Sequence, residues 1–186
     1  MKLLLHICCA PCIAAPLAEL RSGGTEVTGF FHNPNIHPLL EFRKRLRAVE
    51  VFAEQEKLEL IGRPEYGLHD FLRQAGPHAC DGQGGARCAV CYRMRIDAAA
   101  ALAREERFDA FTTSMLFSRH QNHELIRRLA SDAAEREGVG FHYADLRHMA
   151  DQSMEIARKR ALYRQQYCGC IFSEYERYKD TNTRKG

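Results

Sequence analysis

The stretch LLLHICCAPC, residues 3–12, determines how the chain begins to fold. Leu3 to Cys8 form an apolar run that predicts a buried strand. From about Cys12 to Arg21 the pattern is helical, and two glycines at 23–24 are a typical helix end. Because parallel sheets bind ligands at the carboxyl ends of their strands, we expect the cysteines after this strand to belong to a site.

Working outward, apolar runs and helical patterns alternate along the whole chain. Further strands are predicted at residues 27–31, 58–61, 108–113 and 139–143. Helices are predicted over residues 38–52, 91–106, 122–137 and 152–166. The alternation predicts an α/β protein: a single Rossmann-like (HUP-type) three-layer domain with a mostly parallel five-stranded sheet. We expect this domain to cover residues 1–178 and a polar C-terminal tail to cover 179–186.

Composition and charge exclude several classes of protein. The chain has 186 residues, of which 45% are hydrophobic and 27% charged, which excludes disorder, coiled coil and collagen. A net charge of +3 is too small for a general nucleic-acid coat, but it leaves room for a local basic face. The run Leu3–Leu5 is too short for a signal peptide, and no stretch approaches a membrane span of about 18 apolar residues. We therefore expect a cytoplasmic protein with no membrane partner.

Seven of the eight cysteines fall into three tight groups. These groups are Cys8-Cys9-x-x-Cys12, Cys88-x-x-Cys91 and Cys168-Gly169-Cys170. Two C-x-x-C pairs from distant parts of a chain predict a metal site, and thiolates suit both zinc and iron–sulfur clusters. The C-G-C pair could form a small, easily reduced disulfide, which favours a redox pair, although further metal ligands stay open. The remaining cysteine, Cys80, is interpreted as a stray thiol.

Four motifs together resemble the QueH family, the cobalamin-independent epoxyqueuosine reductases formerly described as a domain of unknown function. They are HICCAPC (6–12), NPNIHP (33–38), RC-x-x-CY (87–92) and LYRQ-x-YCGC (162–170), in family order across about residues 3–175. The resemblance implies an oxidoreductase that removes the epoxide oxygen of epoxyqueuosine at the tRNA wobble position, the last step of queuosine biosynthesis. It also implies a [4Fe-4S] cluster beside a second, mononuclear metal, expected to be iron.

The resemblance carries over to individual residues. Positions matching the cluster ligands are Cys8, Cys9, Cys88 and Cys91. Cys168 and Cys170 match a redox-active pair, and Cys12 a position at the second metal, so these three are the expected catalytic residues. Apart from this carry-over, we expect substrate contacts at Asn33, Asn35, His37, Tyr92, Tyr163, Arg164 and Tyr167. Two alternatives stay open: residues 33–38 could cap the following helix, and the tyrosines could be ordinary packing residues. The chain departs from the family at residues 76–81 and 157–159, where an acidic segment and Ser-Lys are usual, so substrate contacts there are not carried over.

The chemistry implied by the resemblance needs a source of electrons. Turning an epoxide into an alkene takes two electrons and two protons, which a cluster or a dithiol can supply and other side chains do not. The expected partners are a tRNA carrying epoxyqueuosine in its anticodon and an unidentified electron donor. Basic groups at 43–47, 127–128 and 158–160 are candidates for phosphate contacts, and tyrosines near the cysteines for base stacking.

Two other functions stay open. A cluster-dependent tRNA thiolase of the ATP-pyrophosphatase type needs a phosphate loop, Ser-Gly-Gly-x-Asp-Ser, directly after the first strand. Residues 22–24 resemble a fragment of that loop, but they follow the first helix and are better explained as its end. The other alternative is a zinc-binding RNA adaptor, in which the two C-x-x-C pairs form a structural clip and no reaction occurs.

Overall fold

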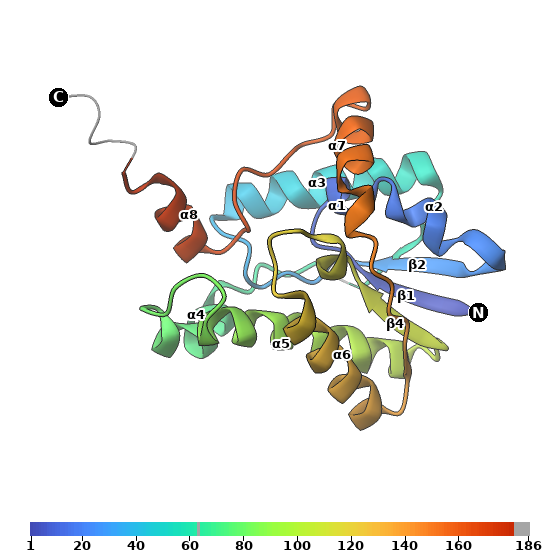
Figure 1. Cartoon of the computed structure of the whole chain (residues 1–186), viewed down its shortest axis with the longest axis horizontal. Coiled ribbons are helices and arrows are strands. Elements are labelled where there is room, and N and C mark those ends of the chain that lie inside the picture. The colour runs from blue at the N-terminus through green and yellow to red at the C-terminus, as the bar shows by residue number, and fades with distance from the viewer. Residues whose placement is uncertain (63, 181–186) are drawn as a thin grey trace.

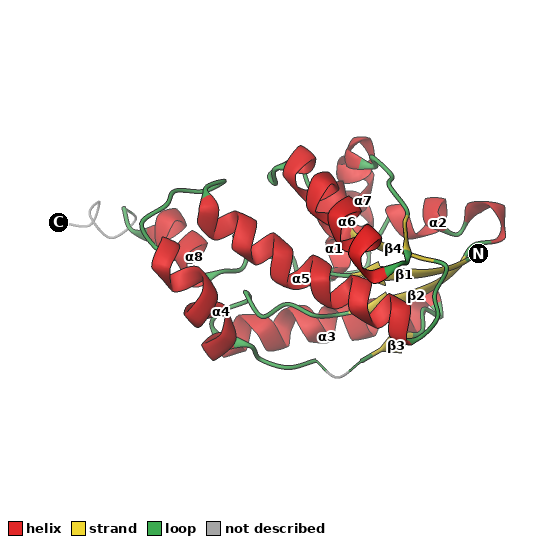
Figure 2. Cartoon of the chain, turned by 90° about the horizontal axis from the view of Figure 1, so that it is seen from below, coloured by secondary structure: helices red, strands yellow, loops and turns green. Residues whose placement is uncertain are grey.

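A computed structural model describes residues 1–62 and 64–180 and contains one five-stranded parallel sheet between layers of helices (Figures 1 and 2). The strands are β1 (Lys2–His6), β2 (Glu26–Phe30), β3 (Leu60–Ile61), β4 (Ala110–Thr113) and β5 (Gly140–Phe141), in the order β3-β2-β1-β4-β5. Each pair of neighbours in this sheet is parallel. The expected Rossmann-like α/β fold with five strands is therefore confirmed.

Helices cover both faces of the sheet. They are α1 (Ala10–Ile13), α2 (Pro16–Leu20), α3 (Leu39–Glu56), α4 (Leu68–Ala75), α5 (Ala86–Glu105), α6 (His123–Glu137), α7 (Ala150–Lys159) and α8 (Ile171–Tyr178). α1, α2, α3 and α7 lie on one face, and α5 and α6 on the other (Figures 1 and 2). The apolar run of β1 has no solvent exposure, as expected for a central strand covered on both faces.

Several helix boundaries differ from the sequence prediction. The first helix is broken into α1 and α2, because Pro16 has no N–H to donate to the carbonyl one turn earlier. The last predicted helix ends at Lys159 rather than near residue 166, and Ala161 adopts a left-handed conformation (φ 51°). α5 begins at Ala86, five residues before the predicted start. The sequence pattern does not predict α4 and α8.

The sheet order places β1 at the point where the connections change faces. The helices after β1 and after β4 lie on opposite faces, so the carboxyl ends of these neighbouring strands border a crevice suited to ligands. β1 runs from the N-terminus toward α4 and α8 (Figure 1). No helix in the described part of the chain has the length and apolar character needed to cross a membrane. The predicted polar tail lies mostly outside the described residues, which end at 180.

Candidate metal and redox centre

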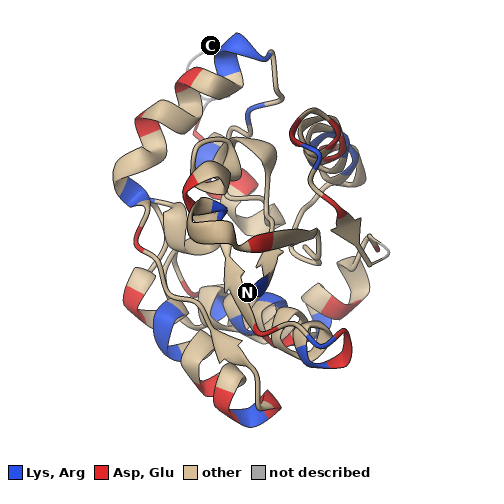
Figure 3. Cartoon of the chain, turned by 90° about the vertical axis from the view of Figure 1, so that its right-hand side faces the viewer, with Lys and Arg blue, Asp and Glu red and all other residues tan. Residues whose placement is uncertain are grey.

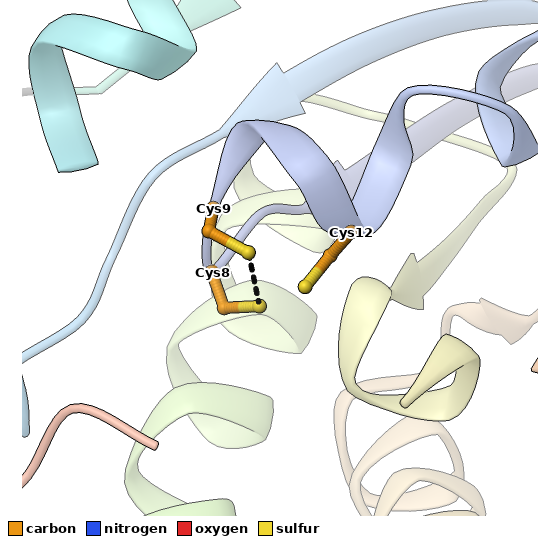
Figure 4. A group of neighbouring side chains, drawn as sticks. All are labelled: Cys8, Cys9 and Cys12. Carbon is orange, nitrogen blue, oxygen red and sulfur yellow. Dashed lines mark hydrogen bonds between the residues drawn. The ribbon is translucent and has the colours of Figure 1, made fainter. Parts of the chain in front are cut away.

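The first cysteine group stands where β1 ends and α1 begins. Cys9 is the residue before α1, and Cys12 lies within it. The three Sγ atoms of Cys8, Cys9 and Cys12 lie within 4.8 Å of one another, and those of Cys8 and Cys9 are 3.8 Å apart. Figure 4 shows the Cys12 side chain turned toward the other two. Among the described residues, this is the group of three or more potential ligands with the spacing for a metal ion.

Local hydrogen bonds make Cys8 the thiol of this group that ionises most readily. Hydrogen bonds with Cys12 and Cys9 hold the pKa of Cys8 well below its usual range, and the Ser114 hydroxyl, which donates to Cys8 Sγ at 3.3 Å, adds to the effect. Burial raises the pKa of Cys9, and the hydrogen bond with Cys8 raises that of Cys12. A thiolate held by two thiols fits a metal that would replace their protons and take three sulfur ligands.

The C-terminal segment reaches this group from the other end of the chain. Gln165 Nε2 donates to Cys9 Sγ at 3.0 Å and lies 3.8 Å from Cys12 Sγ. Gln165 belongs to the connection between α7 and α8, which crosses the molecule over α3 (Figure 1). Since Cys168 follows three residues later, this contact brings the C-G-C group toward the first cysteine group.

The second C-x-x-C pair and the C-G-C group also meet. Cys91 and Cys170 are buried and pack together against α4. Cys88 is half-buried on the first turn of α5, and its Sγ accepts a backbone amide of the preceding loop at 3.3 Å. Cys168 is exposed but close enough to Cys91 and Cys170 to interact with them electrostatically. All three sequence groups therefore lie in one region.

Within that region, the cysteines close enough to share one metal ion are not the four cluster ligands that the resemblance implies. Cys12 joins Cys8 and Cys9 in the 4.8 Å group, and neither Cys88 nor Cys91 belongs to it. The four-cysteine ligand set and the separate second metal are not tested by this geometry and stay predictions.

A buried ion pair on α3 holds the C-G-C segment. Arg45 is only 2% exposed, and its Nε donates to Glu41 Oε1 at 2.7 Å. Its Nη1 and Nη2 donate to the carbonyls of Cys168 and Tyr167 at 2.9 and 3.0 Å. The Tyr163 hydroxyl donates to the same Glu41 carboxylate. The prediction that Arg45 belongs to a basic surface group is wrong, because its side chain is buried and binds the C-G-C segment. We call the pair of Glu41 and Arg45 the α3 clamp.

Gly169 lets this segment approach α3 closely. Its φ is +134°, and an added Cβ would stand 3.0 Å from Arg45 Nη1 and 3.2 Å from Ile36 Cγ1. The Gly169 carbonyl accepts the amide of His37 at 2.8 Å, and the Tyr167 hydroxyl donates to the His37 carbonyl at 2.5 Å. The glycine between the two cysteines therefore joins the C-G-C segment to the loop after β2.

That loop carries buried polar atoms without partners. Asn33, Asn35 and His37 are each 1% exposed. Within the described residues, Oδ1 of Asn33, both side-chain polar atoms of Asn35 and both ring nitrogens of His37 make no hydrogen bond. Burial lowers the pKa of His37 to about 4, so its ring is neutral at pH 7. Such atoms are costly to bury, so polar groups of a ligand that reached this loop would stabilise it.

The other predicted substrate contacts differ in exposure. Tyr92 of α5 is buried, and its hydroxyl accepts a hydrogen bond from the backbone amide of Asn122, the residue before α6, at 3.4 Å. Tyr163 and Tyr167 are half-buried with their hydroxyls engaged at the α3 clamp and the loop after β2. Arg164 is exposed.

Three residues near the cysteines do not stand out in the sequence as members of a site. Ser114 directly follows β4, and its place at the end of the strand beside β1 was a usable signal. Gln165 lies inside the motif at 162–170, but no spacing rule shows where its amide points. Arg95 follows Cys91 by one helical turn, and its Nη2 donates to Cys91 Sγ at 3.3 Å.

Comparison with known proteins shows the family of the chain. The family model described as epoxyqueuosine reductase QueH matches residues 3–176. The chain belongs to the QueH family. Epoxyqueuosine reductase QueH of Dehalococcoides mccartyi is 38% identical over 182 residues, which are 98% of this chain and 97% of the relative. The QueH of Thermotoga maritima is 30% identical, with 94% of this chain and 91% of the relative covered.

QueH proteins are named as reductases, so the family is one of oxidoreductases, in agreement with our main hypothesis and not with the thiolase. Residues 22–24 form a short 3₁₀ turn after α2 with Gly23 and Gly24 at φ 71° and 82°, which confirms that these glycines end a helix. A solved structure from Methanocaldococcus jannaschii, described as a predicted subunit of tRNA methyltransferase, aligns with a TM-score of 0.52 and 11% identity, covering 88% of this chain and 90% of the other. It supports the fold alone.

Proposed function

We propose that this protein is an epoxyqueuosine reductase that removes the epoxide oxygen of epoxyqueuosine at the wobble position of a tRNA, the last step of queuosine biosynthesis. The proposal includes a cytoplasmic location and independence of cobalamin. The observation that carries it is the meeting of three cysteine groups, from residues 8–12, 88–91 and 168–170, near the carboxyl end of β1 in a chain of the QueH family.

The cysteines would hold the metals in the arrangement that the family resemblance implies. Proposed ligands of a [4Fe-4S] cluster are Cys8, Cys9, Cys88 and Cys91, and Cys12 would bind a second metal, iron. When bound, these groups supply single electrons and a Lewis acid. The chain's own contribution is electrostatic: the Ser114 hydroxyl stabilises charge on Cys8, and the Gln165 amide orients the sulfur of Cys9.

The dithiol of Cys168 and Cys170 balances the reaction. Reduction of an epoxide to an alkene consumes two electrons and two protons and releases one water. Two thiols that join as a disulfide release two electrons and two protons, so one oxidation of the pair matches one turnover. An external two-electron reductant, not yet identified, would then restore both thiols.

The loop after β2 is the proposed seat of the modified base. Asn35 offers an amide donor and acceptor, and Asn33 offers its oxygen, since its Nδ2 already donates to the Ile7 carbonyl at 2.8 Å. The neutral ring of His37 can donate from one nitrogen and accept at the other. Tyr163 and Tyr167 precede the C-G-C segment, and Lys44 and Arg45 each cover one of these rings. The opposite faces would stack a splayed anticodon base, the usual way in which single-stranded RNA is recognised. Arg164 between them would contact a phosphate.

The tRNA backbone has a candidate path beside this loop. Lys and Arg are interleaved with Asp and Glu over the molecule (Figure 3), so RNA affinity needs a local basic group. A groove of about 460 Å³ between α3 and the end of α7 has an apolar floor that includes Leu40, Val51 and Leu162, and it is bordered by Arg43, Lys44, Arg47, Arg160 and Tyr163. Tyr163 also donates to Glu41, which pairs with the Arg45 that binds the C-G-C segment, so the groove lies beside the elements that hold this segment.

The test is anaerobic purification with iron, sulfide and zinc analysis and a visible spectrum, followed by an assay of epoxyqueuosine removal from tRNA. We expect about four irons and four sulfides per chain for the cluster, further metal for the second site, and a brown band near ~400 nm. C168A and C170A should lose turnover but keep this absorbance. C80A, which removes an exposed cysteine outside the three groups, should resemble the wild type.

Two results would contradict the proposal at different points. Loss of the cluster in C168A would contradict the assignment of that residue as a redox thiol. A colourless protein that holds zinc alone, even after anaerobic reconstitution with iron and sulfide, would overturn the reductase and favour the RNA adaptor.

A further inference from the structure

Arg95 is a buried cation in the middle of the cysteine region. It lies on α5, one turn after Cys91, and is 1% exposed. Its Nη2 donates to Cys91 Sγ at 3.3 Å and its Nε to the Cys91 carbonyl at 3.2 Å. Its guanidinium also stands 5.9 Å from the centre of the Tyr92 ring. The side chain is therefore held in one position with its charge turned to sulfur.

What sets Arg95 apart from the other buried arginines is its lack of a carboxylate partner. Arg45 pairs with Glu41 at 2.7 Å, and Arg87 pairs with Glu176 at 2.8 Å. No Asp or Glu oxygen of the described residues lies within 4.0 Å of the Arg95 guanidinium. A buried charge without a counter-ion strongly disfavours the folded state, so such a group indicates an anion that the bare chain does not supply.

The sulfurs around Arg95 identify the chemistry of that anion. Cys91 Sγ accepts its N–H directly, and Cys8 and Cys168, from the other two sequence groups, are close enough to interact with its guanidinium electrostatically. A neutral thiol offers little to a guanidinium, but a thiolate-bound metal centre carries net negative charge. Arg is also well suited to buried ion pairs, because it stays charged and its fork of N–H groups is rigid.

We propose that Arg95 is a positioning residue whose guanidinium is the buried counter-ion of an anionic thiolate–metal centre held by the cysteine groups. This rests on the proposed function, since it requires that the centre be bound. Two consequences follow from its charge. The cation holds the anionic centre in the protein, and it makes reduction, which adds negative charge, more favourable. Without the centre, the same cation destabilises the fold.

The test compares R95M, R95K and R93M. Arg93 lies on the same helix but is exposed, so R93M removes one charge without touching the site. In anaerobically purified protein, R95M should lose iron to a chelator about 10–100-fold faster than the wild type, the range typical of residues that support metal ligands, and its midpoint potential should be lower. R95K should recover much of both, and R93M should match the wild type.

Unfolding of the metal-free proteins separates this role from a structural one. In the metal-free protein Arg95 has lost its proposed counter-ion, so its buried charge no longer stabilises the fold. Metal-free R95M should therefore unfold at the same or a higher urea concentration than metal-free wild type. R95M with wild-type iron retention and potential, or with a clearly less stable metal-free form, would overturn the proposal. If the wild type binds zinc alone, the reductase hypothesis fails, and zinc retention in the same variants tests the counter-ion.

Discussion

Among single residues, His37 combines a side chain that is 1% exposed with a ring that makes no close hydrogen bond to a side chain of the described residues. Burial lowers its pKa to about 4, against about 6.5 in an unfolded chain. Between these two pH values His37 binds a proton in the unfolded state but stays neutral in the native state. The free energy of unfolding should therefore fall as pH falls from about 6.5 to about 4, by on the order of 3 kcal/mol from this histidine.

H37Q removes the titrating group and should have a shallower dependence of stability on pH than the wild type over this window. Urea unfolding of the metal-free proteins between pH 4 and 7 measures the difference. His6, with a pKa lowered by burial to about 3, adds a similar trend to both proteins and cancels in the comparison. Equal slopes for H37Q and the wild type would show that His37 is not kept neutral by burial.

At the level of helices and strands, the sequence predicted an element correctly where a single strong feature, such as an apolar run or a pair of glycines, marked it. The apolar run of β1 and the glycines after α2 were interpreted correctly, because burial and positive φ each leave a direct mark on composition. α4 and α8 have eight residues each, too few for a clear helical period, and tertiary packing decides them. α7 ends at Lys159, and the segment after it contacts Arg45 of α3, a long-range contact that a local pattern does not show.

The α3 clamp gives a prediction for that segment. R45M would leave Glu41 buried without its cation, so we expect the free energy of unfolding to fall by about 3 kcal/mol or more. The amide of His37, which donates to Gly169, should exchange its hydrogen faster once the C-G-C segment is released. Urea unfolding and hydrogen exchange measure the two effects.

R47M is the matched control for the clamp. Arg47 lies on the same helix, 72% exposed and paired with Glu50 at 3.4 Å, so its removal should change stability by no more than about 0.5 kcal/mol. The double variant E41Q/R45M should recover part of the stability that R45M loses, because no unpaired carboxylate stays buried. If R45M unfolds like R47M, the buried pair does not hold the segment.

For the whole molecule, the sequence motifs identified which cysteines matter, but not how they meet. Parallel strand order explains why Cys8 lies beside Ser114, since β1 and β4 are neighbours with their carboxyl ends together. The return of Gln165 to Cys9 spans 156 residues and leaves no local trace in the sequence. Arg45 shows the same limit: among four basic residues in a row of five, only packing reveals that this one faces inward.

The groove between α3 and α7 carries the last prediction, because it concerns the whole tRNA rather than one base. Removing one cation that binds a phosphate should reduce the slope of log affinity against log salt by about 0.7–0.9, so R43Q/K44Q should reduce it by about 1.4–1.8 for substrate tRNA. R127Q/R128Q removes the same charge from exposed positions on α6, the other paired candidate for phosphate contacts, which lies outside the groove. If the groove binds the RNA, this variant should keep the wild-type slope. Fluorescence anisotropy over a salt series measures both. If R43Q/K44Q keeps the wild-type slope, the groove does not bind the RNA. Continued epoxide removal by that variant would show that the reductase proposal does not depend on the groove.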